Sequence, residues 1–83
     1  MSVQVELLPR IVERIDALLA EKPLSPHYVP NALAATFGAR TRFAHGTHEL
    51  AIAGLKVTNT AGGDNLIKAW AARARRIIAE QSR

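Results

Sequence analysis

The sequence predicts a small α+β domain with the element order α-α-β-β-β-α, in which an antiparallel meander packs against helices. Apolar side chains recur at helical spacing near both ends of the chain, whereas residues 40–60 alternate with a period close to two. Gly46 and Gly54 stand between the alternating segments, where turns are needed. A chain of 83 residues supports one hydrophobic core, so residues 1–83 are expected to form a single domain.

The first predicted helix begins near Leu8 and runs to Leu19. Its apolar stripe consists of Leu8, Ile11, Val12, Ile15, Leu18 and Leu19. Pro9 fits only the first helical turn, because farther along it would remove a backbone donor and collide with the carbonyl group four residues earlier. The residues before Leu8 are compatible with a short strand through Val3 and Val5 or with a helical turn kinked at Pro9, and the pattern leaves both alternatives open.

A connector and a short second helix follow. Residues 22–30 hold three prolines, which exclude a continuous helix there. The second helix is expected to begin at Pro30 or Asn31 and to end at Phe37, because Gly38 suits the left-handed position after a helix.

Residues 29–38 resemble the first helix and turn of a helix-turn-helix, a likeness that covers ten residues. No recognition helix follows, because residues 39–46 alternate like a strand and end in glycine. The resemblance therefore leaves only a winged-helix-like variant.

Three short strands are expected at residues 40–44, 49–53 and 55–60, joined as an antiparallel meander. The Ala-Gly-Gly segment at residues 61–63 ends the last strand. Asp64 or Asn65 is then expected to cap the final helix by accepting hydrogen bonds from its free amide groups.

The final helix, from about residue 66 onward, is amphipathic and basic. Its apolar face holds Leu66, Ile67, Trp70, Ala71, Ala74, Ile77 and Ile78. Trp70 is the single tryptophan of the chain, and its place in this stripe predicts a core residue. The alanines of the helix would let another element approach closely, whether from the same chain or from a second copy. A homodimer is therefore one of the alternatives that the sequence leaves.

Positive charge is concentrated in this last segment. Residues 1–22 carry three basic and four acidic side chains, residues 23–64 carry three and two, and residues 65–83 carry five and one. The overall charge of +4 thus lies at the end of the chain. Such an asymmetry favours nucleic acid, an anionic membrane surface or an acidic protein as partner, and of these we expect no membrane contact.

The sequence contains no residue arrangement that predicts catalysis or metal binding. The chain has no cysteine, and its serines do not form a nucleophile–base arrangement. His45, His48 and Glu49 form the densest group of metal-ligating residues, but the two histidines are three apart around a glycine and fit a turn better than a metal site. We therefore expect no enzyme, no metal and no cofactor. No apolar run approaches the length of a membrane span, and the protein is expected in the cytoplasm.

Small size, richness in alanine and arginine, and the absence of catalytic groups resemble the small accessory proteins that phages or mobile elements of GC-rich bacteria encode. The resemblance implies a protein that binds and blocks a host macromolecule. No motif identifies a particular family, and no functional residue is carried over from one.

The leading hypothesis is a non-catalytic binding protein, an inhibitor or modulator that contacts an acidic surface of a host protein. The residues expected to make the contact are the cations of the final helix, extended by those of the sheet if it packs beside that helix: Lys68, Arg73, Arg75, Arg76, Arg40, Arg42 and Lys56. The alternative is a nucleic-acid-binding regulator that uses the same side chains on phosphates, with Arg40 and Arg42 on a hairpin or wing.

Overall fold

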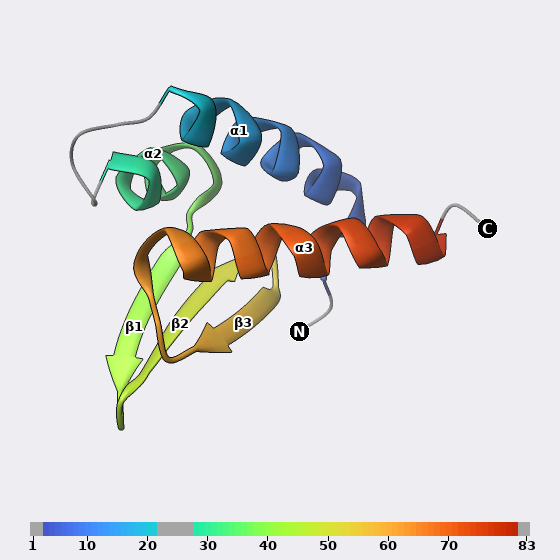
Figure 1. The fold of residues 1–83 in the computed structure, drawn as a ribbon. Coiled ribbons are helices and arrows are strands. Elements are labelled where there is room, and N and C mark those ends of the chain that lie inside the picture. Colours follow the sequence, from blue (N-terminus) through green and yellow to red (C-terminus); the bar gives the residue numbers. More distant parts are fainter. Residues whose placement is uncertain (1–2, 22–27, 82–83) are drawn as a thin grey trace.

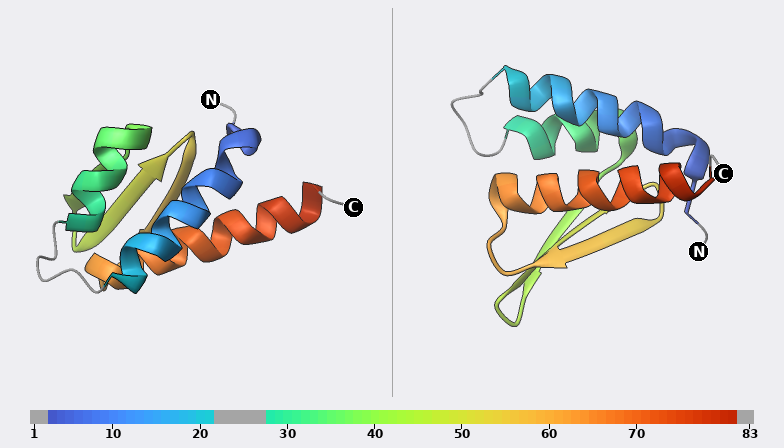
Figure 2. Two further views of the ribbon diagram at one scale, coloured as in Figure 1. Left: turned by 90° about the horizontal axis from the view of Figure 1, so that it is seen from above. Right: turned by 45° about the vertical axis from the view of Figure 1, so that its right-hand side comes forward.

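The computed structural model describes residues 3–21 and 28–81 and confirms the α+β class and the predicted element order (Figure 1). Three antiparallel strands form a sheet of order β1-β2-β3. All three α-helices lie on one side of this sheet, and the β1–β2 hairpin extends away from them (Figure 2). We call the side of the sheet that faces the helices the inner face and the opposite side the outer face.

Helix α1 (Leu8–Ala20) begins where Pro9 requires, with the proline in its first turn. The two alternatives for the preceding residues are resolved in favour of a helical turn, because η1 (Val5–Leu7) is a 3-10 turn that leads directly into α1. The backbone N–H of Gln4 donates to the carbonyl of Ala53 at 2.8 Å. This hydrogen bond ties the start of the described chain to the turn between β2 and β3.

Helix α2 (Tyr28–Phe37) begins two residues earlier than expected, and Pro30 lies within its first turn. A proline costs no hydrogen bond there, because the first amide groups of a helix have no partner inside it. The helix ends as expected, with Gly38 at a φ of 70°. Gly38 N–H donates to the carbonyl of Ala34 at 3.0 Å, which is the bond of an αL cap, and Ala39 N–H donates to the carbonyl of Leu33 at 3.4 Å. Residues 22–27 of the proline-rich connector lie outside the described residues.

The sheet is built from two hairpins, each with a two-residue turn. Strand β1 (Arg40–Ala44) is joined to β2 (Thr47–Ile52) by His45 and Gly46, and β2 to β3 (Leu55–Asn59) by Ala53 and Gly54. All four turn residues have φ between 53° and 83°, as type I′ turns require. This geometry explains why β2 begins and ends earlier than expected: the first turn uses only two residues, and Ala53 belongs to the second turn.

Replacing Ala53 with asparagine is expected to stabilise the protein by about 0.5–1 kcal/mol. Alanine is strained at a φ of 53°, whereas asparagine before glycine is the preferred pair for a type I′ turn. Urea denaturation followed by circular dichroism measures the change. His45→Asn, in the other turn at a φ of 54°, is the matched control and should gain less, because histidine tolerates this conformation better than alanine does. An Ala53→Asn variant less stable than wild type would contradict the prediction.

The core lies between the inner face of the sheet and the helices. Leu50, Ile52 and Leu55 of the sheet are buried there, together with the apolar stripes of α1 and α3 and with Val29 and Leu33 of α2. Trp70 is fully buried, which confirms its predicted place in the core, and its indole Nε1 donates to the Leu55 carbonyl at 2.9 Å.

Helix α3 (Gly63–Gln81) begins before the residues expected to cap it, and Asp64 lies inside its first turn. The N–H of Leu66 already bonds to the carbonyl of Gly62 at 3.2 Å. The turn before the helix is held instead by Asn59, whose Oδ1 accepts a hydrogen bond from Gly62 N–H at 2.8 Å. Asn59 of β3 therefore fixes the turn that leads into α3.

Candidate binding surface

The cations of α3 divide between two flanks of the helix. Arg73 and Arg76 lie beside β3, where both line a groove. Arg75 lies on the α1 side and bonds to the carboxylate of Asp16 at 2.5 Å. Lys68 is seven residues, or about two turns, before Arg75 and therefore shares its side of the helix. Of the four cations predicted to act together on α3, the structure brings together Arg73 and Arg76.

The ion pair between Arg75 and Asp16 joins α3 to α1 at the surface. The side chains of Arg75 and Asp16 are 51% and 56% exposed, so the pair adds at most about 1 kcal/mol to stability. Because its guanidinium is held by a carboxylate of the same chain, Arg75 is less available to an external partner than Arg73 or Arg76.

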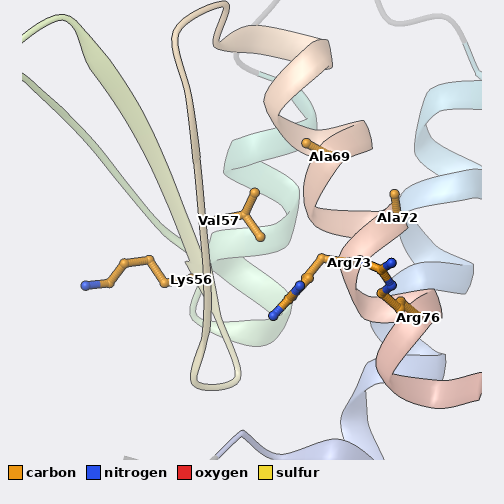
Figure 3. A pocket seen from close by; sticks show the side chains of 6 residues that line it. All are labelled: Lys56, Val57, Ala69, Ala72, Arg73 and Arg76. Carbon is orange, nitrogen blue, oxygen red and sulfur yellow. The ribbon is translucent and has the colours of Figure 1, made fainter. Parts of the chain in front are cut away.

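The groove between β3 and α3 has a volume of about 620 Å³ and is open to solvent (Figure 3). We call it the β3–α3 groove, and it is lined by Lys56, Val57, Ala69, Ala72, Arg73 and Arg76. Ala69 and Ala72 of α3 have small side chains, which leave open space between α3 and β3. Arg73 extends from α3 toward β3 across this space (Figure 3). The groove therefore combines an apolar floor with two guanidinium groups.

The two groove arginines carry unneutralised positive charge. Neither Arg73 nor Arg76 forms an ion pair with another residue in the part of the chain that the structure describes. Lys56 differs, because its ammonium group points away from the groove and lies 3.8 Å from the Glu49 carboxylate (Figure 3). The stem of Lys56 thus forms one lip of the groove, while its charge belongs to the outer face of the sheet.

The remaining cations predicted to bind a partner lie on the outer face of the sheet. Arg40 and Arg42 stand on alternate positions of β1, and Arg42 is paired in register with Glu49 of β2, which in turn contacts Lys56 of β3. Because side chains alternate along a strand, Arg40, Arg42, Glu49 and Lys56 share one face. The helices cover the opposite face (Figures 1 and 2). Arg40 and Arg42 therefore form a second basic surface, separate from the β3–α3 groove.

The histidines and Glu49 do not gather as metal ligands. His45 is a turn residue and His48 lies on the inner face, where its ring packs against Phe43 with the centroids 4.4 Å apart. Glu49, the next residue of the strand, points to the outer face. Within residues 3–21 and 28–81 no three His, Asp or Glu side chains are grouped as a metal site would need. His27 lies outside these ranges.

A smaller cleft of about 360 Å³ lies between the start of α2, the β1–β2 hairpin and the start of α3. Phe43, the aromatic side chain of the hairpin that lines this cleft, is 59% exposed. Sequence reasoning missed both this aromatic side chain and the alanine floor of the β3–α3 groove. Helical spacing places Ala69 and Ala72 on the same flank as Arg73 and Arg76, but it does not show that this flank faces β3.

Comparisons with protein-family models, curated proteins and solved structures find no match to this chain. In the described part of the chain, none of the helices combines the length and the apolar character needed to cross a membrane. The candidate surface is therefore interpreted from its own geometry and charge.

Proposed function

We propose that this is a non-catalytic binding protein of the cytoplasm that contacts an acidic surface of a host protein through the β3–α3 groove. The observation that carries the proposal is the pair Arg73 and Arg76, which flank an apolar floor and have no ion-pair partner among the described residues. A role as inhibitor or modulator follows from the resemblance to phage accessory proteins.

The chemistry of the groove suits carboxylate recognition. A guanidinium group presents parallel N–H donors that match the two oxygens of a carboxylate, and such charge-assisted bonds are stronger than neutral ones. Contact with the apolar floor formed by Val57, Ala69 and Ala72 would exclude water from these bonds. An acidic side chain between Arg73 and Arg76 would therefore contribute more to binding than one at a fully solvated lysine.

Replacing Arg73 and Arg76 together with glutamine is expected to weaken partner binding by at least about tenfold, because two charge-assisted hydrogen bonds are lost. Glutamine keeps helix propensity nearly unchanged. Host proteins retained by the wild-type protein after nuclease treatment are identified, and the affinity of the purified partner is then measured by calorimetry at about 150 mM salt.

Lys68→Gln/Arg75→Gln is the matched control, because it removes the same charge from the other flank of α3. It should change the affinity by less than about threefold, since it alters only long-range electrostatics. Equal losses in the two double variants would show that the groove has no special role and would contradict the proposal.

The outer face supports a second candidate function, nucleic-acid binding. Arg40, Arg42 and Lys56 share this face, and the helices of the described chain leave it open. If it binds phosphates, random duplex DNA should bind at micromolar concentration or tighter at about 150 mM salt, with an affinity that falls steeply as salt rises. Arg40→Gln/Arg42→Gln should then abolish binding while Arg73→Gln/Arg76→Gln leaves much of it. Millimolar binding, or none, would exclude this candidate.

A further inference from the structure

Strand β3 is an edge strand of the sheet, with β2 on one side only. In an antiparallel pair, alternate residues direct both backbone groups to the neighbouring strand, and the residues between them direct both groups away. The two-residue turn makes Ile52 and Leu55 a hydrogen-bonded pair, and the register continues with Leu50 opposite Val57. The backbone N–H and C=O groups of Lys56 and Thr58 therefore point away from β2.

The backbone groups of Lys56 lie at the β3–α3 groove, and those of Thr58 follow two residues farther along the same strand edge. Lys56 and Val57 form its β3 side, and Ala69, Ala72 and the two arginines form its α3 side. No residue in the described part of the chain outside the sheet hydrogen-bonds to the backbone of Lys56 or Thr58. The groove thus offers an unpaired strand edge and unneutralised guanidinium groups side by side (Figure 3).

We propose that the open edge of β3 accepts an extended acidic peptide segment of a partner protein as a fourth strand. The inference rests on the proposed function and specifies how the partner binds. Main-chain hydrogen bonds to Lys56 and Thr58 supply sequence-independent affinity, and alternate side chains of the added strand supply specificity. Five residues in β3 extend over about 16 Å, so a segment of five to seven residues fills the edge.

The positions of the arginines define the peptide that fits. Side chains of an added strand alternate between the outer face and the side of α3. Those on the α3 side lie over Ala69 and Ala72 and within reach of Arg73 and Arg76, so aspartate or glutamate at every second position fits the charge. A second copy of this chain fits poorly, because a symmetric pairing of two β3 edges would bring the groove arginines of both copies close to one another.

The test uses a synthetic peptide of about seven residues that alternates glutamate with valine or threonine, and two N-methylated forms of it. One form carries methyl groups on the amides of the glutamates and the other on the amides of the intervening residues. Because alternate amides of a strand point to opposite edges, only one form blocks pairing with β3. Binding is measured by NMR titration of the intact protein, with amide hydrogen exchange at Lys56 and Thr58 as the second readout.

Strand addition predicts that one methylated form binds at least about tenfold more weakly than the parent while the other binds nearly as well. The parent should also slow hydrogen exchange at the amides of Lys56 and Thr58. All variation is in the peptide, so no protein variant has to fold. Equal binding of the two methylated forms, without protection of these amides, would overturn strand addition while leaving charge recognition by the groove intact.

Two other results would also overturn the inference. One is the absence of parent-peptide binding at about 1 mM, the weak limit for a peptide contact. The other is a concentration-dependent dimer in sedimentation that protects the same two amides, because it would assign the edge to a second copy of the chain. Loss of partner affinity in Arg73→Gln/Arg76→Gln remains an independent test of the groove itself, so failure of the strand model and failure of the proposed function are distinguishable.

Discussion

Replacing Trp70 with alanine is expected to destabilise the domain by about 3–5 kcal/mol and to leave most of it unfolded at 37 °C. The side chain is fully buried between α3 and the sheet, and its removal leaves a large cavity. A domain of this size has a total stability near the low end of about 5–15 kcal/mol, so this single loss is comparable with the whole. Thermal unfolding by circular dichroism should show a midpoint lowered by roughly 12–40 °C.

Trp70→Phe separates packing from the hydrogen bond. It keeps most of the aromatic contact but removes the Nε1 donor that lies 2.9 Å from the carbonyl of Leu55. We expect it to cost about 1–2 kcal/mol, clearly less than the alanine variant. Since Trp70 is the only tryptophan, its emission maximum in the wild-type protein should also be shifted to the blue of an exposed indole. If the alanine variant melts like the wild-type protein, the conclusion that Trp70 is a core residue is wrong.

Replacing Gly62 with alanine is expected to be the most damaging of the glycine substitutions, at about 2–4 kcal/mol. Gly62 has a φ of 68°, which an alanine adopts only under strain. A β-carbon added there would also lie 2.8 Å from Cγ and Cδ2 of the His48 ring. That ring is also in contact with Phe43, which restricts its freedom to withdraw.

Gly38→Ala is the matched control for this prediction. Its φ of 70° gives the same backbone strain, but nothing lies within 4 Å of an added β-carbon. It should cost about 1 kcal/mol, and the difference between the two variants isolates the collision with His48. In a double-mutant cycle, His48→Ala should recover about 1–2 kcal/mol of the loss in Gly62→Ala. Equal melting of the two glycine variants would show that the ring moves aside freely.

Periodicity in the sequence was sufficient to predict the α+β class, the order of the elements and the burial of Trp70. It was not sufficient for boundaries that depend on turn and cap geometry. Ala53 reads as a strand residue because it is small and apolar, yet the two-residue turn requires it at a positive φ. Asp64 reads as a helix cap, yet Asn59, three residues before Gly62, bonds to the turn instead.

The cations could be identified from the sequence, but their grouping could not. Helical spacing places both Arg75 and Arg76 away from the apolar stripe, but only the packing of α3 directs Arg75 toward Asp16 and Arg76 to the β3–α3 groove. Which flank of α3 faces the sheet depends on contacts between residues far apart in the chain. The sequence pattern also could not predict that the edge of β3 is open. A meander alone does not show which strand edges the helices cover.

The edges of the sheet also bear on how the protein stays dispersed at high concentration. An unpaired strand edge is a template for aggregation, and natural sheets counter this by carrying charged side chains there. Both edge strands of this sheet carry charged side chains, Arg40 and Arg42 on β1 and Lys56 on β3. The second candidate function, nucleic-acid binding, would use these same side chains, so substitutions that neutralise them to weaken phosphate binding would also remove a safeguard against fibrous self-assembly.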